Sequence, residues 1–219
     1  MMATSVSGPP GLRESNKART RLAISDVATQ LFITHGFENV TVAQIAAAAN
    51  VSVKTVFNYF SSKEELFFDR ADDVLAALSD AVRARPAGTA PLEALRAVLA
   101  DRRVPFDRRG WRPLRDPGDY ERFRSFIATE HAAPALRERR LVIAESWIAP
   151  LAAVLEQELG LRGGDRSARV LAAMVIAVVG LRERELSAAM LAGAAPRTVE
   201  RRVRAVVDEG FARLTAAFG

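Results

Sequence analysis

The sequence contains no cysteine, which excludes disulfide bonds, thiol chemistry and cysteine-based zinc sites. It has only two histidines, His35 and His131. It also lacks the G-x-S-x-G, glycine-rich phosphate-loop and H-E-x-x-H patterns that mark several large enzyme classes. Both histidines stand at the ends of expected helices, where capping accounts for them. No catalytic residue, metal ligand or cofactor is therefore predicted.

Long apolar runs are missing as well. The longest, from Val170 to Leu181, has twelve residues, whereas a membrane-spanning helix needs roughly 18 or more. The opening residues MMATSVSGPPG lack the basic region and apolar core of a signal peptide. We therefore expect no membrane partner and a cytoplasmic location.

Alternating β-branched residues are almost absent, and the helix-forming residues Ala, Leu, Arg and Glu dominate. The apolar spacing predicts an all-α fold of about nine helices. A Pro/Gly-rich loop is expected over 104–118, and Pro150 is expected to bend one helix near Trp147. The expected helices span 17–35, 42–49, 53–59, 63–84, 91–103, 119–131, 134–159, 166–191 and 196–218.

Residues 41–63, TVAQIAAAANVSVKTVFNYFSSK, carry the most specific pattern of the chain. Thr41 is placed to cap a first helix, and Ser52 is placed to cap a second one. Between them Asn50 stands where the chain must turn, and asparagine tolerates the left-handed backbone well. Two short helices joined by a tight turn form a helix-turn-helix, which puts its second helix into the DNA major groove.

The stretch GFENVTVAQIAAAANVSVKTVFNYFSSKEEL, with Leu31-Phe32 ahead of it, resembles the DNA-binding domain of the tetracycline-repressor (TetR) family of bacterial transcription regulators. The resemblance implies a C-terminal helical bundle that binds an effector and dimerises. The expected organisation is a disordered arm over 1–16, a helix-turn-helix domain over 17–61, and an effector-binding and dimerisation domain over 62–219. Many relatives carry a phosphate-bonding tyrosine where this chain has Phe57, so Tyr59 takes that role here.

Positive charge is concentrated in the N-terminal part. Residues 1–63 hold six basic and three acidic side chains, which leaves only +2 of the net +5 for the other 156 residues. This distribution permits DNA binding without demonstrating it.

The start of the second helix supplies the candidates for base contacts, among which Lys54 can donate to guanine. Val56, Phe57 and Phe60 are interpreted as core of the small domain. The predicted DNA-binding residues are Thr41, Ser52, Val53, Lys54, Thr55, Tyr59, Lys63, Arg13, Lys17 and Arg19.

For the larger part, aromatic side chains around the expected loop predict a mainly apolar effector pocket. Its candidates are Phe106, Trp111, Tyr120, Phe123, Phe126, Trp147 and Met174. Ordinary bundle core explains each of these residues equally well. The apolar stripe of the last helix fits either intramolecular packing or the dimer interface that the resemblance implies. Its candidates are Val199, Val203, Val206, Gly210 and Leu214.

The sequence thus predicts a homodimeric regulator that binds a palindromic double-stranded DNA operator. A small, mainly apolar effector, of acyl or similar type, releases it. Activation instead of repression stays open, because the position of the operator decides it. A helical protein-interaction module and an enzyme without DNA binding are the remaining alternatives.

Overall fold

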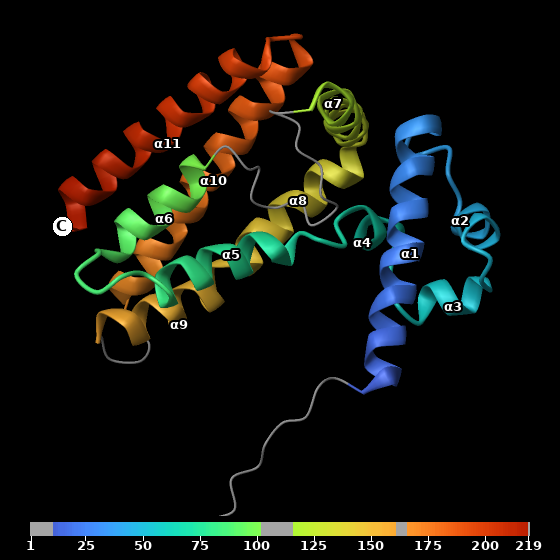
Figure 1. The fold of residues 1–219 in the computed structure, drawn as a ribbon, viewed down its shortest axis with the longest axis horizontal. Helices are drawn as coiled ribbons and strands as arrows, with labels where there is room; N and C mark the ends of the chain where they lie inside the picture. The colour runs from blue at the N-terminus through green and yellow to red at the C-terminus, as the bar shows by residue number, and fades with distance from the viewer. Residues whose placement is uncertain (1–10, 102–115, 161–165, 219) are drawn as a thin grey trace, which may run out of the picture. The chain divides into compact units, whose positions relative to one another are not determined.

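The computed structural model describes residues 11–101, 116–160 and 166–218, and all regular secondary structure in these ranges is α-helical (Figure 1). The predicted all-α fold is confirmed. Within the described ranges, no helix has the length and apolar character needed to cross a membrane. The helices are α1 (Leu12–His35), α2 (Val42–Ala48), α3 (Val53–Phe57), α4 (Lys63–Phe67), α5 (Asp72–Arg83), α6 (Pro91–Ala100), α7 (Pro117–Ala132), α8 (Pro134–Ser146), α9 (Ile148–Leu159), α10 (Arg166–Leu191) and α11 (Pro196–Phe218).

These eleven helices exceed the expected nine because two predicted helices are each interrupted. The helix expected from Ser62 to Ala84 is α4 followed by α5, so the prediction of one continuous helix is wrong. The connecting segment forms tight turns, in which the N–H of Val74 bonds the Ala71 carbonyl at 3.1 Å. Phe67 is fully buried in the N-terminal core and Asp69 pairs with Arg21, so tertiary contacts override the continuous apolar pattern.

The second interruption lies at Trp147, where the sequence predicts a bend in one continuous helix. The N–H of Trp147 bonds the Ala144 carbonyl at 3.3 Å, a three-residue step that closes α8 before α9 begins. Pro150 follows in the first turn of α9, and its missing N–H leaves no donor for a bond one turn back.

The chain divides into two compact units, Met1–Asp69 and Arg70–Gly219. The division lies after Asp69 rather than after residue 61, because α4 packs with α1 in unit 1. Helix α1 already begins at Leu12, so the last residues of the expected arm 1–16 are helical.

An aromatic cluster forms the centre of unit 1. The ring of Phe32 lies 5.1 Å from that of Phe37 and 5.9 Å from that of Phe67. Helix α1 contributes its buried side chains Ile24 and Ala28 at the spacing that the sequence predicts. This core holds the helix-turn-helix against α1.

Unit 2 is built around α10, which packs against α11, α9, α7 and α8. Figure 1 shows α10 and α11 running side by side over most of their length. Arg182 of α10 is fully buried, donates from Nε to the Leu99 carbonyl at the end of α6 at 3.1 Å, and pairs with Glu183. The guanidinium thus satisfies a carbonyl that α6 leaves without a helical partner.

The stripe of α11 proposed for a dimer interface faces inward instead. Val199, Val203 and Leu214 are buried within the single chain. A Cβ added at Gly210 would lie 2.9 Å from a methyl carbon of Val178 in α10, which shows how closely the two helices approach. The interface expected from these residues is therefore corrected to intramolecular packing, and Val206 and Gly210 of the set are partly exposed.

Candidate nucleic-acid interface

Helix α2 begins with a complete capping box. Thr41 Oγ1 accepts from the N–H of Gln44 at 3.2 Å, and Gln44 Oε1 accepts from the N–H of Thr41 at 2.8 Å. The Thr41 hydroxyl also donates to Gln44 Oε1 at 2.9 Å. Capping by Thr41 is confirmed, and its hydroxyl proton is already used within the chain.

The turn between α2 and α3 has the predicted chemistry. Asn50 has φ 54°, the left-handed conformation expected for this position. After the turn, Ser52 Oγ accepts from the N–H of Thr55 at 3.0 Å, which confirms Ser52 as the N-cap of α3. The hydroxyls of Ser52 and Thr55 lie 2.8 Å apart and share a hydrogen bond. The backbone geometry that presents α3 is thus determined by residues next to it in sequence.

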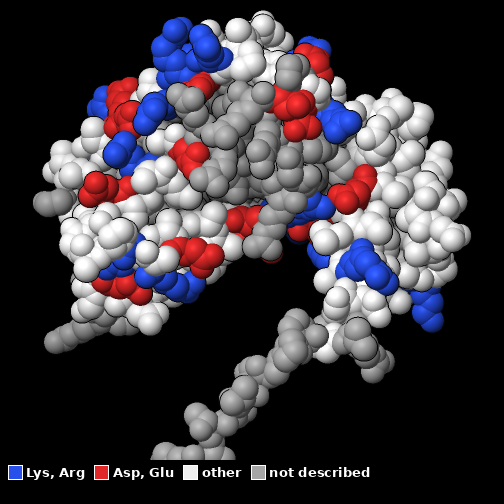
Figure 2. Space-filling view, in the orientation of Figure 1, with Lys and Arg blue, Asp and Glu red and all other residues white. Residues whose placement is uncertain are grey.

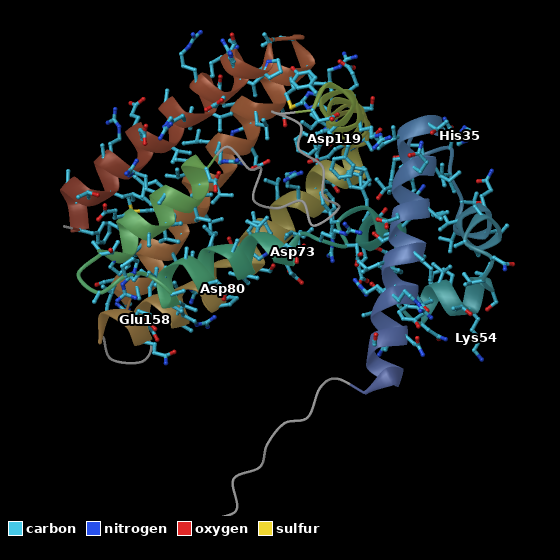
Figure 3. The ribbon with its side chains drawn as sticks, in the orientation of Figure 1. His35, Lys54, Asp73, Asp80, Asp119 and Glu158 are labelled. Atoms are coloured by element: carbon cyan, nitrogen blue, oxygen red, sulfur yellow. The ribbon has the colours of Figure 1, made fainter. Side chains whose placement is uncertain are left out.

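Helix α3 has one buried side and one outward side. Val56 and Phe60 are buried as predicted, whereas Lys54 and Asn58 are exposed. Figure 3 shows Lys54 on the outer side of α3. Phe57 is 53% exposed, so its assignment to the core is wrong: rotation along a 3.6-residue helix carries it away from Val56.

Sequence reasoning missed Asn58, although its position one turn after Lys54 was a usable signal. The exposed outward residues of α3 and its caps are Ser52, Val53, Lys54, Phe57 and Asn58.

Helix α1 and the end of α3 line a shallow hollow on the surface of unit 1. It is lined by Lys17, Ala18, Arg21, Asn58 and Tyr59. Two predicted phosphate contacts, Lys17 and Tyr59, thus lie at one place, and both have exposed or half-exposed side chains. Figure 2 shows a cluster of basic side chains over α1 and a separate basic side chain over α3 on this face of unit 1. An ammonium, a carboxamide and a phenol are all donors that suit phosphate oxygens.

Arg21 of α1 holds the end of α3 in place by hydrogen bonds and ion pairs. Its Nη1 donates to the carbonyl of Tyr59 at 2.6 Å, and its Nη2 lies 2.5 Å from Asp69 Oδ1 and 3.6 Å from Glu65 Oε1. The guanidinium carbon also lies 4.3 Å from the centre of the Phe60 ring. One side chain of α1 therefore holds the end of α3 and both acidic partners.

Lys63 is partly engaged within unit 1. Its Nζ donates to the carbonyl of Phe37 at 2.9 Å and to that of Val40 at 3.2 Å, and it lies 4.2 Å from the centre of the Phe37 ring. Two of the three N–H donors of the ammonium are thus used. Its predicted phosphate contact rests on the third.

Two further DNA-contact candidates, Arg19 and Arg13, lie on α1. Arg19 is exposed on the same α1 segment as Lys17. The side chain of Arg13 lies outside the described residues.

Glu65 introduces a pH dependence into unit 1. Burial alone would raise the pKa of Glu65, but hydrogen bonds from the Ser61 hydroxyl and N–H and the positive charge of Arg21 outweigh it. The pKa therefore lies below its ordinary value of 4.5. Because the folded-state pKa is lowered, the carboxylate stabilises the fold above pH 4.5, and this contribution is lost as the pH falls through the lowered value.

We expect Glu65→Gln to lower the free energy of unfolding by about 1 kcal/mol at pH 7, since charge-assisted hydrogen bonds are lost. The difference from wild type should shrink as the pH falls from 7 towards 3. Urea denaturation of both proteins across this range measures it. A difference that stays constant down to pH 3 would contradict the assigned role.

In unit 2 the aromatic candidates lie mostly in the core. Tyr120, Phe123, Phe126 and Trp147 are buried, and the Phe123 and Phe126 rings are stacked with centroids 6.3 Å apart. The Tyr120 hydroxyl donates to the Ala194 carbonyl at 2.5 Å, which ties α7 to the turn before α11.

Two features bear on the predicted pocket itself. The Nε1–H of Trp147 is buried without a hydrogen-bond acceptor in the described structure. Met174 is exposed on α10, so its assignment to an enclosed pocket is wrong. Phe106 and Trp111 lie outside the described residues.

Comparison with known proteins finds a family match within unit 1. Residues 24–69, which contain α2, α3, α4 and the second half of α1, match the family described as bacterial regulatory proteins, tetR family. This part of the chain is similar to the DNA-binding region of TetR-family regulators. The matched region is built by the capping box of α2, the left-handed Asn50 and the Ser52 cap of the outward-facing α3.

Two curated regulators match with substantial identity. TcmR of Streptomyces glaucescens, an HTH-type transcriptional regulator, is 42% identical over 94 residues, which cover 41% of this chain and 42% of TcmR. BetI of Agrobacterium fabrum, also an HTH-type transcriptional regulator, is 36% identical over 80 residues, which cover 36% of this chain and 39% of BetI. The matches thus span less than half the length of either relative.

The fold similarity extends further than the sequence similarity. NalD, the secondary repressor of the MexAB-OprM multidrug efflux pump in Pseudomonas aeruginosa, superposes with a TM-score of 0.52 at 20% identity. The superposition covers 88% of this chain and 97% of NalD. At this identity the likeness shows that the two chains share a TetR-like all-α fold.

Proposed function

We propose that this chain is a ligand-responsive transcription regulator of the TetR family that binds double-stranded DNA through α3. The observation that carries the proposal is the outward side of α3, where Lys54 and Asn58 stand exposed one turn apart. A groove-reading helix needs such donors, and the core of unit 1 leaves both free of packing.

In this proposal the contacts divide into two classes. Lys54 donates to guanine O6 or N7, and Ser52, Val53 and Thr55 lie beside it at the start of α3. Lys17, Arg19 and Tyr59 contact phosphates, with Thr41 and Lys63 at the two flanking helix starts. The hollow between α1 and α3 supports the second class, since it gathers Lys17 and Tyr59.

We further propose a homodimer on a palindromic operator, with recognition helices about 34–36 Å apart. The support is an exposed apolar stripe on α10, formed by Val170, Met174, Ala177 and Leu181. Their spacing of four, three and four residues is that of a helix seam. A second copy covers this stripe. Sedimentation velocity tests the dimer, and a monomer at operator-binding concentrations would contradict it.

A small, mainly apolar effector is proposed to bind unit 2 and lower operator affinity, which makes the chain a repressor. The buried Trp147 supports this class, because its free indole N–H would bond an acceptor on an otherwise apolar molecule. The effector shifts the affinity only as far as it discriminates between two states of the dimer. An operator upstream of the promoter would make the same protein an activator.

A mobility-shift titration against DNA from around the chain's own gene, at two salt concentrations, tests the proposed function. A discrete, salt-sensitive shift that only one palindromic fragment competes away is the expected result. Equal, weak binding to every fragment, in both this DNA and a random pool, would overturn sequence-specific recognition.

Lys54→Ala is expected to weaken operator binding by about 1–3 kcal/mol, which is roughly fivefold to 150-fold, and to relax base preference at one position in each half-site. The matched control is Lys17→Ala, which should weaken binding to all DNA sequences alike. It should also reduce the slope of log K against log salt concentration by about one. Mobility shifts on operator and unrelated DNA measure both. Unchanged operator affinity would remove Lys54 from the base-reading set.

A further inference from the structure

The outward side of α3 carries two neighbouring ridges of opposite character. Val53 and Phe57 stand one turn apart, as do Lys54 and Asn58. The first pair is apolar and the second is polar, and all four side chains are exposed. We call the first pair, Val53 and Phe57, the apolar ridge.

The apolar ridge is exposed, in contrast to the aromatic core of unit 1. Phe57 is 53% exposed and Val53 41%, whereas Phe32, Phe37, Phe60 and Phe67 are buried at 0–3%. The aromatic core is therefore complete without Phe57. Two adjacent large apolar side chains on the surface of so small a unit indicate a contact with an apolar surface outside the chain.

The neighbours of the ridge indicate what that surface is. Ser52, Lys54 and Asn58 flank it on the face proposed to enter the DNA major groove. Neither valine nor phenylalanine carries a polar atom, so neither side chain bonds a phosphate or a base edge. The one apolar group that base pairs present in the major groove is the 5-methyl group of thymine.

We propose that the apolar ridge determines specificity for thymine in each operator half-site, with Val53 and Phe57 packing against thymine methyl groups. The proposal rests on the proposed function, since it requires α3 to lie in the major groove. Asn58 on the adjacent ridge suits the partner base, because an asparagine carboxamide bonds adenine N6 and N7. The apolar ridge and Asn58 together read A·T pairs, whereas Lys54 donates to guanine.

The experiment replaces single thymines by deoxyuridine, which removes only the methyl group. DNA selected from a random pool by the full-length protein supplies the operator, and mobility shifts give Kd for each substituted duplex. We expect one or two positions in each half-site where deoxyuridine weakens wild-type binding about fourfold per methyl, the ratio that corresponds to about 0.8 kcal/mol per buried carbon.

The variants Phe57→Ala and Val53→Ala locate the effect. Each should bind the thymine duplex more weakly and lose discrimination at one of the sensitive positions. Lys54→Ala is the matched control, since it should keep the thymine preference while losing affinity. Because both ridge residues are exposed, their replacement leaves the core intact, and far-UV circular dichroism verifies this.

Three outcomes would overturn the inference. Wild-type binding that is unaffected by deoxyuridine at every position refutes it, while specific binding itself keeps the proposed function. Discrimination that persists in both ridge variants assigns the methyl contact to other residues. Failure of the random pool to yield any specific sequence refutes the proposed function, and the inference falls with it.

Discussion

Replacing Phe67 by alanine is expected to destabilise unit 1 by about 3–5 kcal/mol, the usual cost of deleting a buried phenylalanine ring. Phe67 has no exposed surface, and its ring lies within 6.1 Å of those of Phe32, Phe37 and Phe68. Small domains are stable by only about 5–15 kcal/mol, so the loss would remove much of the stability of the helix-turn-helix.

Urea denaturation followed by far-UV circular dichroism measures this loss. Phe57→Ala is the matched control, because it makes the same chemical deletion at an exposed position of the same unit. Its cost should stay within about 1 kcal/mol, as is usual for surface substitutions. Equal destabilisation by the two variants would contradict the assignment of Phe67 to the core and Phe57 to the surface.

Arg21→Met is the second large effect that we expect, at about 2–3 kcal/mol. The change keeps much of the side-chain volume but removes the Tyr59 hydrogen bond and the Asp69 ion pair. Asp69 is only 3% exposed and Arg21 is 35% exposed, so the pair lies between the surface and buried limits of about 1 and 3–5 kcal/mol. Most of the cost comes from leaving a buried carboxylate without its cation.

A double-mutant cycle with Asp69→Asn tests this origin. The double variant should be more stable than the sum of the two single losses predicts, because no charge is then left unpaired. Arg21→Met should also weaken binding to all DNA sequences, since Arg21 holds the carbonyl that follows α3. Strict additivity of the two stability losses would show that the ion pair is not their cause.

Local features of unit 1 were predictable because their causes lie within a few residues. A cap needs a hydroxyl and an N–H three positions on, and Thr41 and Ser52 supply this geometry by themselves. The left-handed conformation of Asn50 follows from the presence of asparagine in the short turn between α2 and α3. The break at Trp147 likewise follows from the missing N–H of Pro150.

The predictions that failed all depend on contacts between residues that are far apart in the sequence. The apolar periodicity was the same for a helix from Ser62 to Ala84 and for the two helices α4 and α5. Only the contacts of Phe67 and Asp69 with distant parts of unit 1 separate the two cases. In the same way, the apolar spacing of α11, which includes Val203, is the same whether α11 packs on α10 or on a second chain.

Composition, spacing and caps were enough to predict the all-α class, the helix-turn-helix and the position of Lys54 at the start of α3. The tertiary structure alone decided that Phe57 faces outward, that Lys63 is held by two carbonyls and that the α11 stripe is internal. The physical reason is that burial is a property of two surfaces, and the second surface lies tens of residues away along the chain.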